Sequence, residues 1–123
     1  MNLLYKATRD GFSGLNFNEK CNGKKNTFVV VKNEHDKVFG GFTPLEWKKP
    51  TKGTHEYLID NSKKSFLFSM NLEKKLKILK PNYAICCSNN DFGPIFGGGK
   101  FFFFMNFFAF FYFLFILIIF FRI

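Results

Sequence analysis

Hydrophobic residues form short runs up to residue 100 and then one continuous run. Six of the short runs combine β-branched or aromatic residues and are bounded by polar or turn-forming residues, which is typical of β-strands. They predict strands over residues 3–6, 27–32, 38–42, 65–70, 76–79 and 83–87. The adjacent valines of the second run predict a strand that is buried on both faces.

One short helix is predicted over residues 15–21. Ser13 precedes it and can accept a hydrogen bond from a free N–H of the first turn, and Gly23 ends it. Residues 44–54 contain two prolines and three lysines and predict a loop, anchored on the core by Trp47. Short strands with a single helix favour a mostly-β, α+β fold, a sheet or sandwich, over βαβ units.

The composition changes sharply at Lys100. Twelve of the 21 phenylalanines lie in residues 101–123, where Asn106 and Arg122 alone interrupt the apolar run. The preceding hundred residues are enough for one small domain, which excludes a two-domain enzyme. They hold 17 Lys and Arg against 9 Asp and Glu. Because the lysines are scattered between predicted strands, we interpret them as solvated surface and expect no nucleic-acid partner.

The apolar tail runs from Phe101 to Phe121 and is the strongest physical signal in the sequence. A helix of this length would span about 31 Å, at about 1.5 Å per residue, against about 30 Å for a hydrocarbon core. Lys100 and Arg122 flank it and can reach the headgroups. Residues 101–121 therefore predict one transmembrane helix, with the lipid bilayer as partner and residues 1–99 in the cytosol.

The chain thus divides into a β-rich unit, residues 1–99, and a tail, residues 100–123. A second origin explains the tail equally well, because a translated T-rich intron or a frameshift also produces a phenylalanine run. Under that alternative the chain is a truncated or mis-spliced product without function, and its location is cytoplasmic.

The residues that usually carry chemistry form no recognisable site. Cys21, Cys86 and Cys87 are odd in number and lack C-x-x-C spacing, and His35 and His55 are isolated. We therefore expect no metal, no cofactor, no small-molecule substrate and no catalytic residue. The cysteines are interpreted as buried structural thiols in a protein that is not an enzyme; a cysteine-dependent redox enzyme is the alternative.

Two glycine clusters stand out. They are Gly40 and Gly41, and Gly97, Gly98 and Gly99. The second cluster precedes a lysine, but Pro94 replaces the first glycine of a phosphate loop and Phe101 replaces its Ser or Thr. We interpret both clusters as structural, in turns or at positions where a Cβ would clash.

Six short segments occur in a distinctive order along residues 3–99. They are LLYKATRDGFS at 3–13, FNEKC at 17–21, VFGGFT at 38–43 followed by Trp47, SFLFS at 65–69, YAI at 83–85 and GPIFGGG at 93–99. This order resembles the TLDc domain. The resemblance implies a β-sandwich with short flanking helices, no agreed catalytic site, a link to oxidative-stress resistance and binding of the V-type proton ATPase. Family members continue with further strands, so the C-terminal part of the domain is expected to be missing here.

Overall fold

The computed structural model describes residues 2–32, 35–51, 53–88, 92–98, 101–106 and 117–122. In chain order the elements are β1 (Asn2–Lys6), α1 (Ala7–Asp10), α2 (Gly14–Cys21), β2 (Thr27–Lys32), β3 (Val38–Thr43), β4 (His55–Leu58), β5 (Phe66–Ser69), β6 (Lys74–Lys77), the 3₁₀ helix η1 (Pro81–Tyr83), β7 (Ile85–Ser88), β8 (Phe92–Gly98), β9 (Phe101–Asn106) and β10 (Leu117–Arg122). The mostly-β, α+β class is confirmed.

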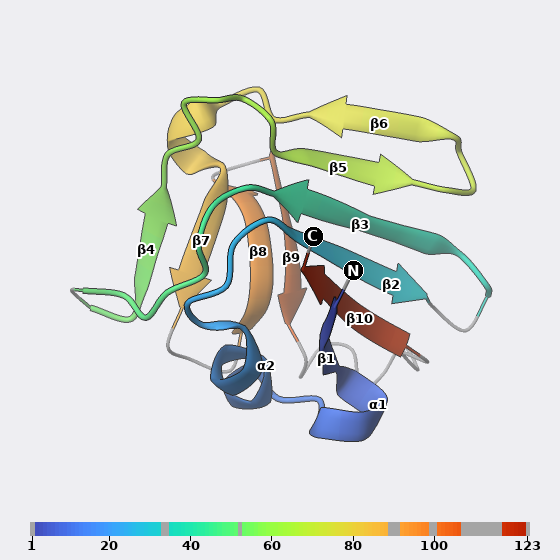
Figure 1. The fold of residues 1–123 in the computed structure, drawn as a ribbon. Helices are drawn as coiled ribbons and strands as arrows, with labels where there is room; N and C mark the ends of the chain where they lie inside the picture. The colour runs from blue at the N-terminus through green and yellow to red at the C-terminus, as the bar shows by residue number, and fades with distance from the viewer. Residues whose placement is uncertain are drawn as a thin grey trace.

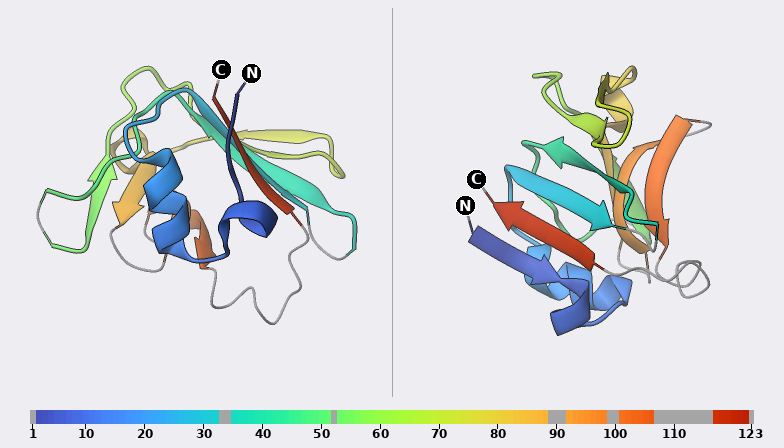
Figure 2. Two further views of the ribbon diagram at one scale, coloured as in Figure 1. Left: turned by 60° about the horizontal axis from the view of Figure 1, so that its bottom comes forward. Right: turned by 90° about the vertical axis from the view of Figure 1, so that its right-hand side faces the viewer.

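The strands form two antiparallel sheets (Figure 1). One sheet has six strands in the order β1-β10-β2-β3-β5-β6, and the other has four in the order β4-β7-β8-β9. In the right-hand view of Figure 2, strands β1, β10, β2 and β3 of the six-stranded sheet lie to the left, β8 and β9 lie to the right, and α1 and α2 lie below. The arrangement is a two-layer β-sandwich with short helices at one end.

The core lies between the two sheets, and β2 shows which way each strand faces it. Val29 and Val31 are fully buried, whereas Phe28 and Val30 are partly exposed. Burial therefore alternates with the period of a strand. The prediction that this strand is buried on both faces is wrong, because Phe28 and Val30 are apolar residues on its outer face.

Trp47 fixes the loop after β3 to the core, as predicted. Its side chain is buried and its indole N–H donates to Thr27 Oγ1 at 2.8 Å. Phe17 of α2 and Phe96 of β8 lie edge-on to it, with ring centroids 5.5 and 5.8 Å away. Edge-to-face pairs of this kind are worth about 0.5–1.5 kcal/mol each beyond the area that they bury. One side chain thus joins the loop, α2 and both sheets.

Helix α2 begins at the predicted cap. Ser13 Oγ accepts a hydrogen bond from the N–H of Asn16 at 3.1 Å, which is the predicted cap of α2. The four-residue helix α1 was not predicted, because Ala7–Asp10 is too short to show an apolar period.

The apolar tail enters both sheets. β9 pairs with β8, and β10 lies between β1 and β2, where Leu117 is opposite Lys32 and Arg122 is opposite Thr27. Within the described ranges, none of the helices has the length and apolar character that crossing a bilayer requires. Residues 107–116 lie outside the described residues.

The helix predicted over residues 101–121 therefore differs from the structure at both of its ends, where strands are found. Phenylalanine and isoleucine favour strands, and a continuous apolar run fits a doubly covered strand as well as a helix. Both β8 and β2 also present edges that β9 and β10 pair with. Residues 101–106 of the tail thus belong to the four-stranded sheet, and residues 117–122 belong to the six-stranded sheet.

Candidate interaction surface

The outer face of the six-stranded sheet carries a row of phenylalanines. The register places Phe28 opposite Phe42, and Phe42 opposite Phe66. Directly opposed residues point to the same face of a sheet. The ring centroids are 4.9 Å apart for Phe28 and Phe42 and 5.5 Å apart for Phe42 and Phe66, with Phe68 6.5 Å from Phe66. We call Phe28, Phe42, Phe66 and Phe68 the phenylalanine face; all four are partly exposed.

The opposite, inward row contains Val29, Gly41 and Leu67. Gly41 leaves room for a ring of the second sheet, since an added Cβ would lie 2.8 Å from the tip of Phe96. At Gly40 an added Cβ would lie 1.8 Å from the carbonyl oxygen of Val29. The pair of glycines therefore allows β3 to approach β2 and β8 closely while Phe42 faces outward.

The second glycine cluster lies at the end of β8. Gly97 has a φ of +83°, in the region that favours glycine, and pairs with Phe102, while Gly98 pairs with Phe101. Gly99, like Lys100, lies outside the described residues. Gly97 and Gly98 thus belong to the strand that pairs with β9.

Positive charge borders the phenylalanine face along β6. Lys77 is opposite Phe66 and Lys75 is opposite Phe68. The ammonium nitrogen of Lys75 lies 4.1 Å from the ring centroid of Phe66, within the range of a cation–π contact. The sheet face therefore combines flat aromatic rings with a cationic edge.

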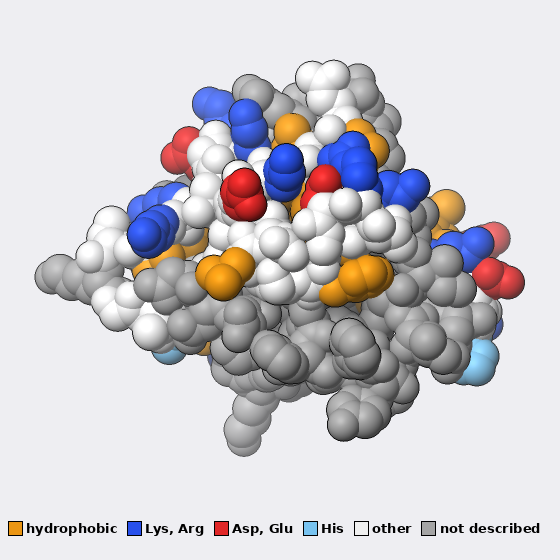
Figure 3. Space-filling model, turned by 90° about the horizontal axis from the view of Figure 1, so that it is seen from below, with side chains coloured by type: hydrophobic (Ala, Val, Ile, Leu, Met, Phe, Trp, Pro, Cys, Tyr) orange, Lys and Arg blue, Asp and Glu red, His pale blue; other side chains and the backbone are white. Residues whose placement is uncertain are grey.

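No described helix or strand covers this face. In both views of Figure 2, α1 and α2 lie at one end of the sandwich and away from the outer face of β2, β3 and β5. Figure 3 shows the underside, where many basic and a few acidic side chains are exposed and the described hydrophobic side chains form separate patches. The phenylalanine face is therefore the more coherent candidate for contact with a partner.

The three cysteines are buried, at most 4% exposed. Burial raises the pKa of the Cys21 and Cys86 thiols, and it raises the pKa of Cys87 to about 11. Cys86 and Cys87 are adjacent in β7 yet both buried, because this strand has a covered face on each side. The thiols are therefore protonated at neutral pH, the form that is a poor nucleophile.

His35 and His55 are both exposed, and the latter lies in β4. Among the described residues, no three His, Cys, Asp or Glu side chains come close enough together to hold a metal ion. Within the described part of the chain, the cysteines and histidines considered in the sequence therefore form no metal-binding cluster.

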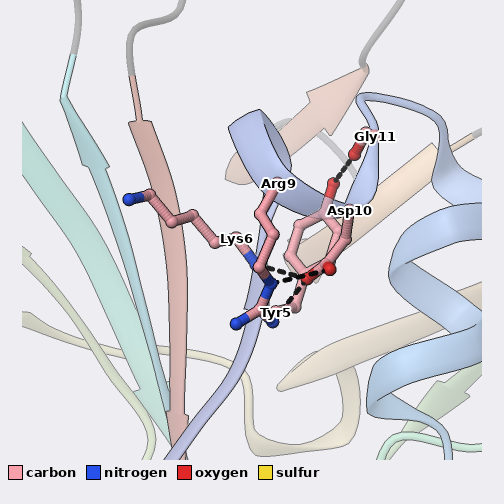
Figure 4. A network of polar contacts seen from close by, with 5 residues as sticks. All are labelled: Tyr5, Lys6, Arg9, Asp10 and Gly11. Carbon is pink, nitrogen blue, oxygen red and sulfur yellow. Dashed lines mark hydrogen bonds and ion pairs between the residues drawn. The ribbon is translucent and has the colours of Figure 1, made fainter.

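A polar network closes the turn after β1 (Figure 4). Asp10 accepts hydrogen bonds from the backbone N–H of Lys6 at 3.0 Å and from the guanidinium of Arg9 at 2.8 and 2.7 Å. The hydroxyl of Tyr5 donates to the carbonyl of Gly11. The Arg9 contact in particular lowers the pKa of Asp10 to about 2. Both oxygens of this carboxylate accept hydrogen bonds, and one of these bonds ties α1 to the end of β1. We therefore interpret the role of Asp10 as structural.

Asp60 is a second engaged carboxylate, and sequence reasoning missed it. Its oxygens accept from the backbone N–H groups and the hydroxyls of Ser62 and Ser65. Burial opposes ionisation, but these hydrogen bonds outweigh it and hold the pKa of Asp60 below its usual value. The signal in the sequence is Asp60 followed by a serine two positions later, which is typical of an Asx turn.

A surface pocket of about 290 Å³ lies beside α2. Its lining residues are Leu15, Asn18, Glu19, Asn22, Lys49 and Ser88. The Asn18 amide already donates to the Ser88 carbonyl at 2.8 Å, and the single acid faces a single base. The lining therefore offers no set of convergent groups for a charged ligand.

Comparison with known families gives one assignment. The family model described as the TLDc domain matches residues 1–112, whereas no curated protein matches the chain at a significant level. The resemblance seen in the sequence ended at residue 99, whereas the match to the family model continues beyond it and includes all of β9. Since the matched region covers nearly the whole sequence and the fold is the expected β-sandwich with short helices, this chain belongs to the TLDc domain family.

Proposed function

We propose that this TLDc domain is a non-enzymatic protein-interaction module in oxidative-stress resistance, with the phenylalanine face as its binding surface. The observation that carries the proposal is the row of Phe28, Phe42 and Phe66 on a sheet face that none of the described helices and strands covers. Soluble domains usually place charged or small polar residues at such outward positions of an antiparallel sheet. Four adjacent aromatic rings there favour contact with another macromolecule.

The energetics suit a protein partner. Phenylalanine is enriched in the buried centres of protein interfaces, and covering its exposed area contributes about 25 cal/mol per Å². Lys75 and Lys77 lie at the border of the rings, where charged residues set orientation and association rate. A partner with an apolar centre and an acidic rim would match this surface.

The resemblance to the TLDc family suggests the V-type proton ATPase as the partner. We infer that the phenylalanine face contacts the cytosolic sector of that enzyme. The buried cysteines support a binding role over a thiol-based enzyme, since their pKa values are raised and their Sγ atoms are shielded.

The test compares two single substitutions in the full chain. Phe66→Ser removes the central ring of the face, and Leu15→Ser removes an exposed leucine of α2 at the opposite end of the sandwich. Binding to purified V-type ATPase is measured by interferometry, after circular dichroism shows that both variants fold. We expect about tenfold weaker binding for Phe66→Ser, as for a residue worth about 1.4 kcal/mol at an interface. Equal binding by both variants would refute the assignment of the surface.

The cellular role needs a separate readout. Cells that produce the Phe66→Ser variant should lose survival under peroxide to the level of cells lacking the protein, while Leu15→Ser cells should not. If both variants protect equally, the phenylalanine face is not the surface used in stress resistance.

Membrane anchoring through residues 101–121 is a second candidate function. The observation in its favour is an apolar stretch of 21 residues between Lys100 and Arg122. It competes with the first proposal, because the same residues cannot form a bilayer-spanning helix and strands β9 and β10 together. Alkaline carbonate extraction of membranes decides: retention in the pellet supports the anchor, and release supports the strands. Sequencing the transcript across the codons for residues 99–104 tests whether the tail is encoded in the spliced message.

A further inference from the structure

The hairpin at the far edge of the six-stranded sheet projects from the sandwich (Figure 1, upper right). It consists of β5, the turn Met70–Glu73, β6 and the residues up to Lys80, and we call it the lysine hairpin. We propose that the lysine hairpin docks the domain on the surface of an anionic phospholipid bilayer. Its apolar side chains would enter the headgroup region while its lysines contact the lipid charges.

Four large apolar side chains of this hairpin face solvent. Met70 is 63% exposed, Leu72 69%, Leu76 58% and Leu79 87%. Every residue from 70 to 77 is exposed, so neither side of β6 lies against the second sheet. Soluble monomers seldom expose several large apolar residues on one projection unless it meets a membrane or a partner.

The same segment is strongly basic. Residues 70–80 have a net charge of +3, because they contain one acidic residue, Glu73, and four lysines, Lys74, Lys75, Lys77 and Lys80. Lysines next to an anionic membrane contribute favourable energy, and their aliphatic stems can lie along apolar neighbours. Apolar residues beside lysines are the composition of interfacial membrane-binding segments.

The backbone holds the turn in place. The N–H of Met70 donates to the carbonyl of Val38 at 2.9 Å, and the N–H of Val38 donates to Asn71 Oδ1 at 2.7 Å. The N–H of Leu72 donates to Ser69 Oγ at 3.3 Å. Met70 and Leu72 are therefore presented by a hydrogen-bonded turn tied to β3, which lowers the ordering cost of insertion.

A bilayer fits these residues better than an acidic peptide does. A peptide strand added to the edge of β6 would pair with Lys74–Lys77, but Leu72 and Leu79 lie beyond both ends of that strand. A bilayer interface takes up all four apolar side chains and the lysines between them. Lysines along an edge strand also oppose the addition of another strand.

The experiment is sedimentation of the full chain with vesicles of phosphatidylcholine, with and without phosphatidylserine. One variant combines Met70→Ser with Leu72→Ser, and another combines Lys74→Gln with Lys80→Gln, which leaves the lysines beside the phenylalanine face unchanged. The matched control combines Leu15→Ser with Lys20→Gln on α2, because Leu15 is as exposed as Leu76 and Lys20 is exposed. All substitutions lie at exposed positions, and unchanged thermal unfolding is required of each.

We expect binding only to vesicles that contain phosphatidylserine, weakened by salt and abolished by the Met70 and Leu72 substitutions. Each lysine replaced should weaken partitioning about fivefold, whereas the control variant should bind like the parent. Binding that survives both hairpin variants would overturn the proposal, and so would lysine-dependent binding of polyglutamate with no binding to vesicles. The inference is independent of the protein-binding role, because the vesicle assay contains no partner protein.

Discussion

Removal of the last two strands should unfold this domain rather than release a soluble one. The perturbation is a stop codon after Gly99, which deletes β9 and β10. In the full chain β10 forms six residue pairs with β2 and four with β1. An antiparallel ladder has about one hydrogen bond per residue pair, and each is worth about 0.5–1.5 kcal/mol net. The two ladders of β10 thus contribute about 5–15 kcal/mol, which matches the whole folding free energy of a typical domain.

The assay is urea unfolding followed by circular dichroism, together with amide hydrogen exchange over β2. The shortened chain should lack a cooperative transition, and the N–H groups of Thr27–Lys32 should exchange without protection. The substitution Ile119→Pro in the full chain provides a second test, because proline removes a ladder donor in the middle of β10. If the shortened chain unfolds cooperatively with the midpoint of the full chain, β10 is not a strand of this sheet and the bilayer-spanning helix is favoured.

Four further outcomes follow from individual residues of the fold. Thr27→Val should cost about 1–3 kcal/mol in urea unfolding, because it leaves the buried indole N–H of Trp47 without its acceptor; no loss would mean that this bond is absent. Gly40→Ala should cost at least about 2 kcal/mol by the same measurement, since the added Cβ meets a backbone oxygen at 1.8 Å, and an unchanged midpoint would contradict that close approach. The pKa of Asp10 is about 2, below the usual value of about 3.9, so its contribution is present above about pH 4 and lost as the pH falls towards 2. Asp10→Asn should therefore destabilise the domain at pH 7 and have little effect near pH 2; equal losses at both would refute the ionic role. In the folded chain Cys21 should react with iodoacetamide at neutral pH far more slowly than in urea, as read by mass spectrometry, and equal rates would revive the thiol-enzyme alternative.

Local sequence signals were sufficient to predict the elements that are bounded by capping or turn-forming residues. Ser13 precedes α2 and Gly23 follows it. Trp47 could be identified as an anchor because a large aromatic side chain in a loop rich in lysine is expected to pack on the core, and it is buried. The strand at Thr27–Lys32 was evident from its β-branched residues.

Long-range pairing could not be obtained in this way. The phenylalanine face exists only because the register places Phe28, Phe42 and Phe66 in one row, and register is a property of three strands together. Val30 on the outer face of β2 completes a run of three valines, and this run predicted a strand buried on both faces. The tail is ambiguous for a related reason. An apolar run that only Asn106 interrupts has no period, so its length favoured a helix, whereas residues 101–106 and 117–122 pair with strands of the two sheets in the structure.

The placement of β10 has a consequence for the order in which the chain folds during synthesis. Asn2 near the start pairs with Arg122 near the end, so β1 has no neighbour in its sheet until almost the whole sequence has left the ribosome. Until then the edge of β2 that pairs with β10 stays exposed, together with Phe28. Such late, distant closure slows folding and prolongs the exposure of apolar strand edges. A nascent chain of this protein should therefore depend on chaperones that cover strand edges, and its yield should fall more steeply with growth temperature than its final stability implies.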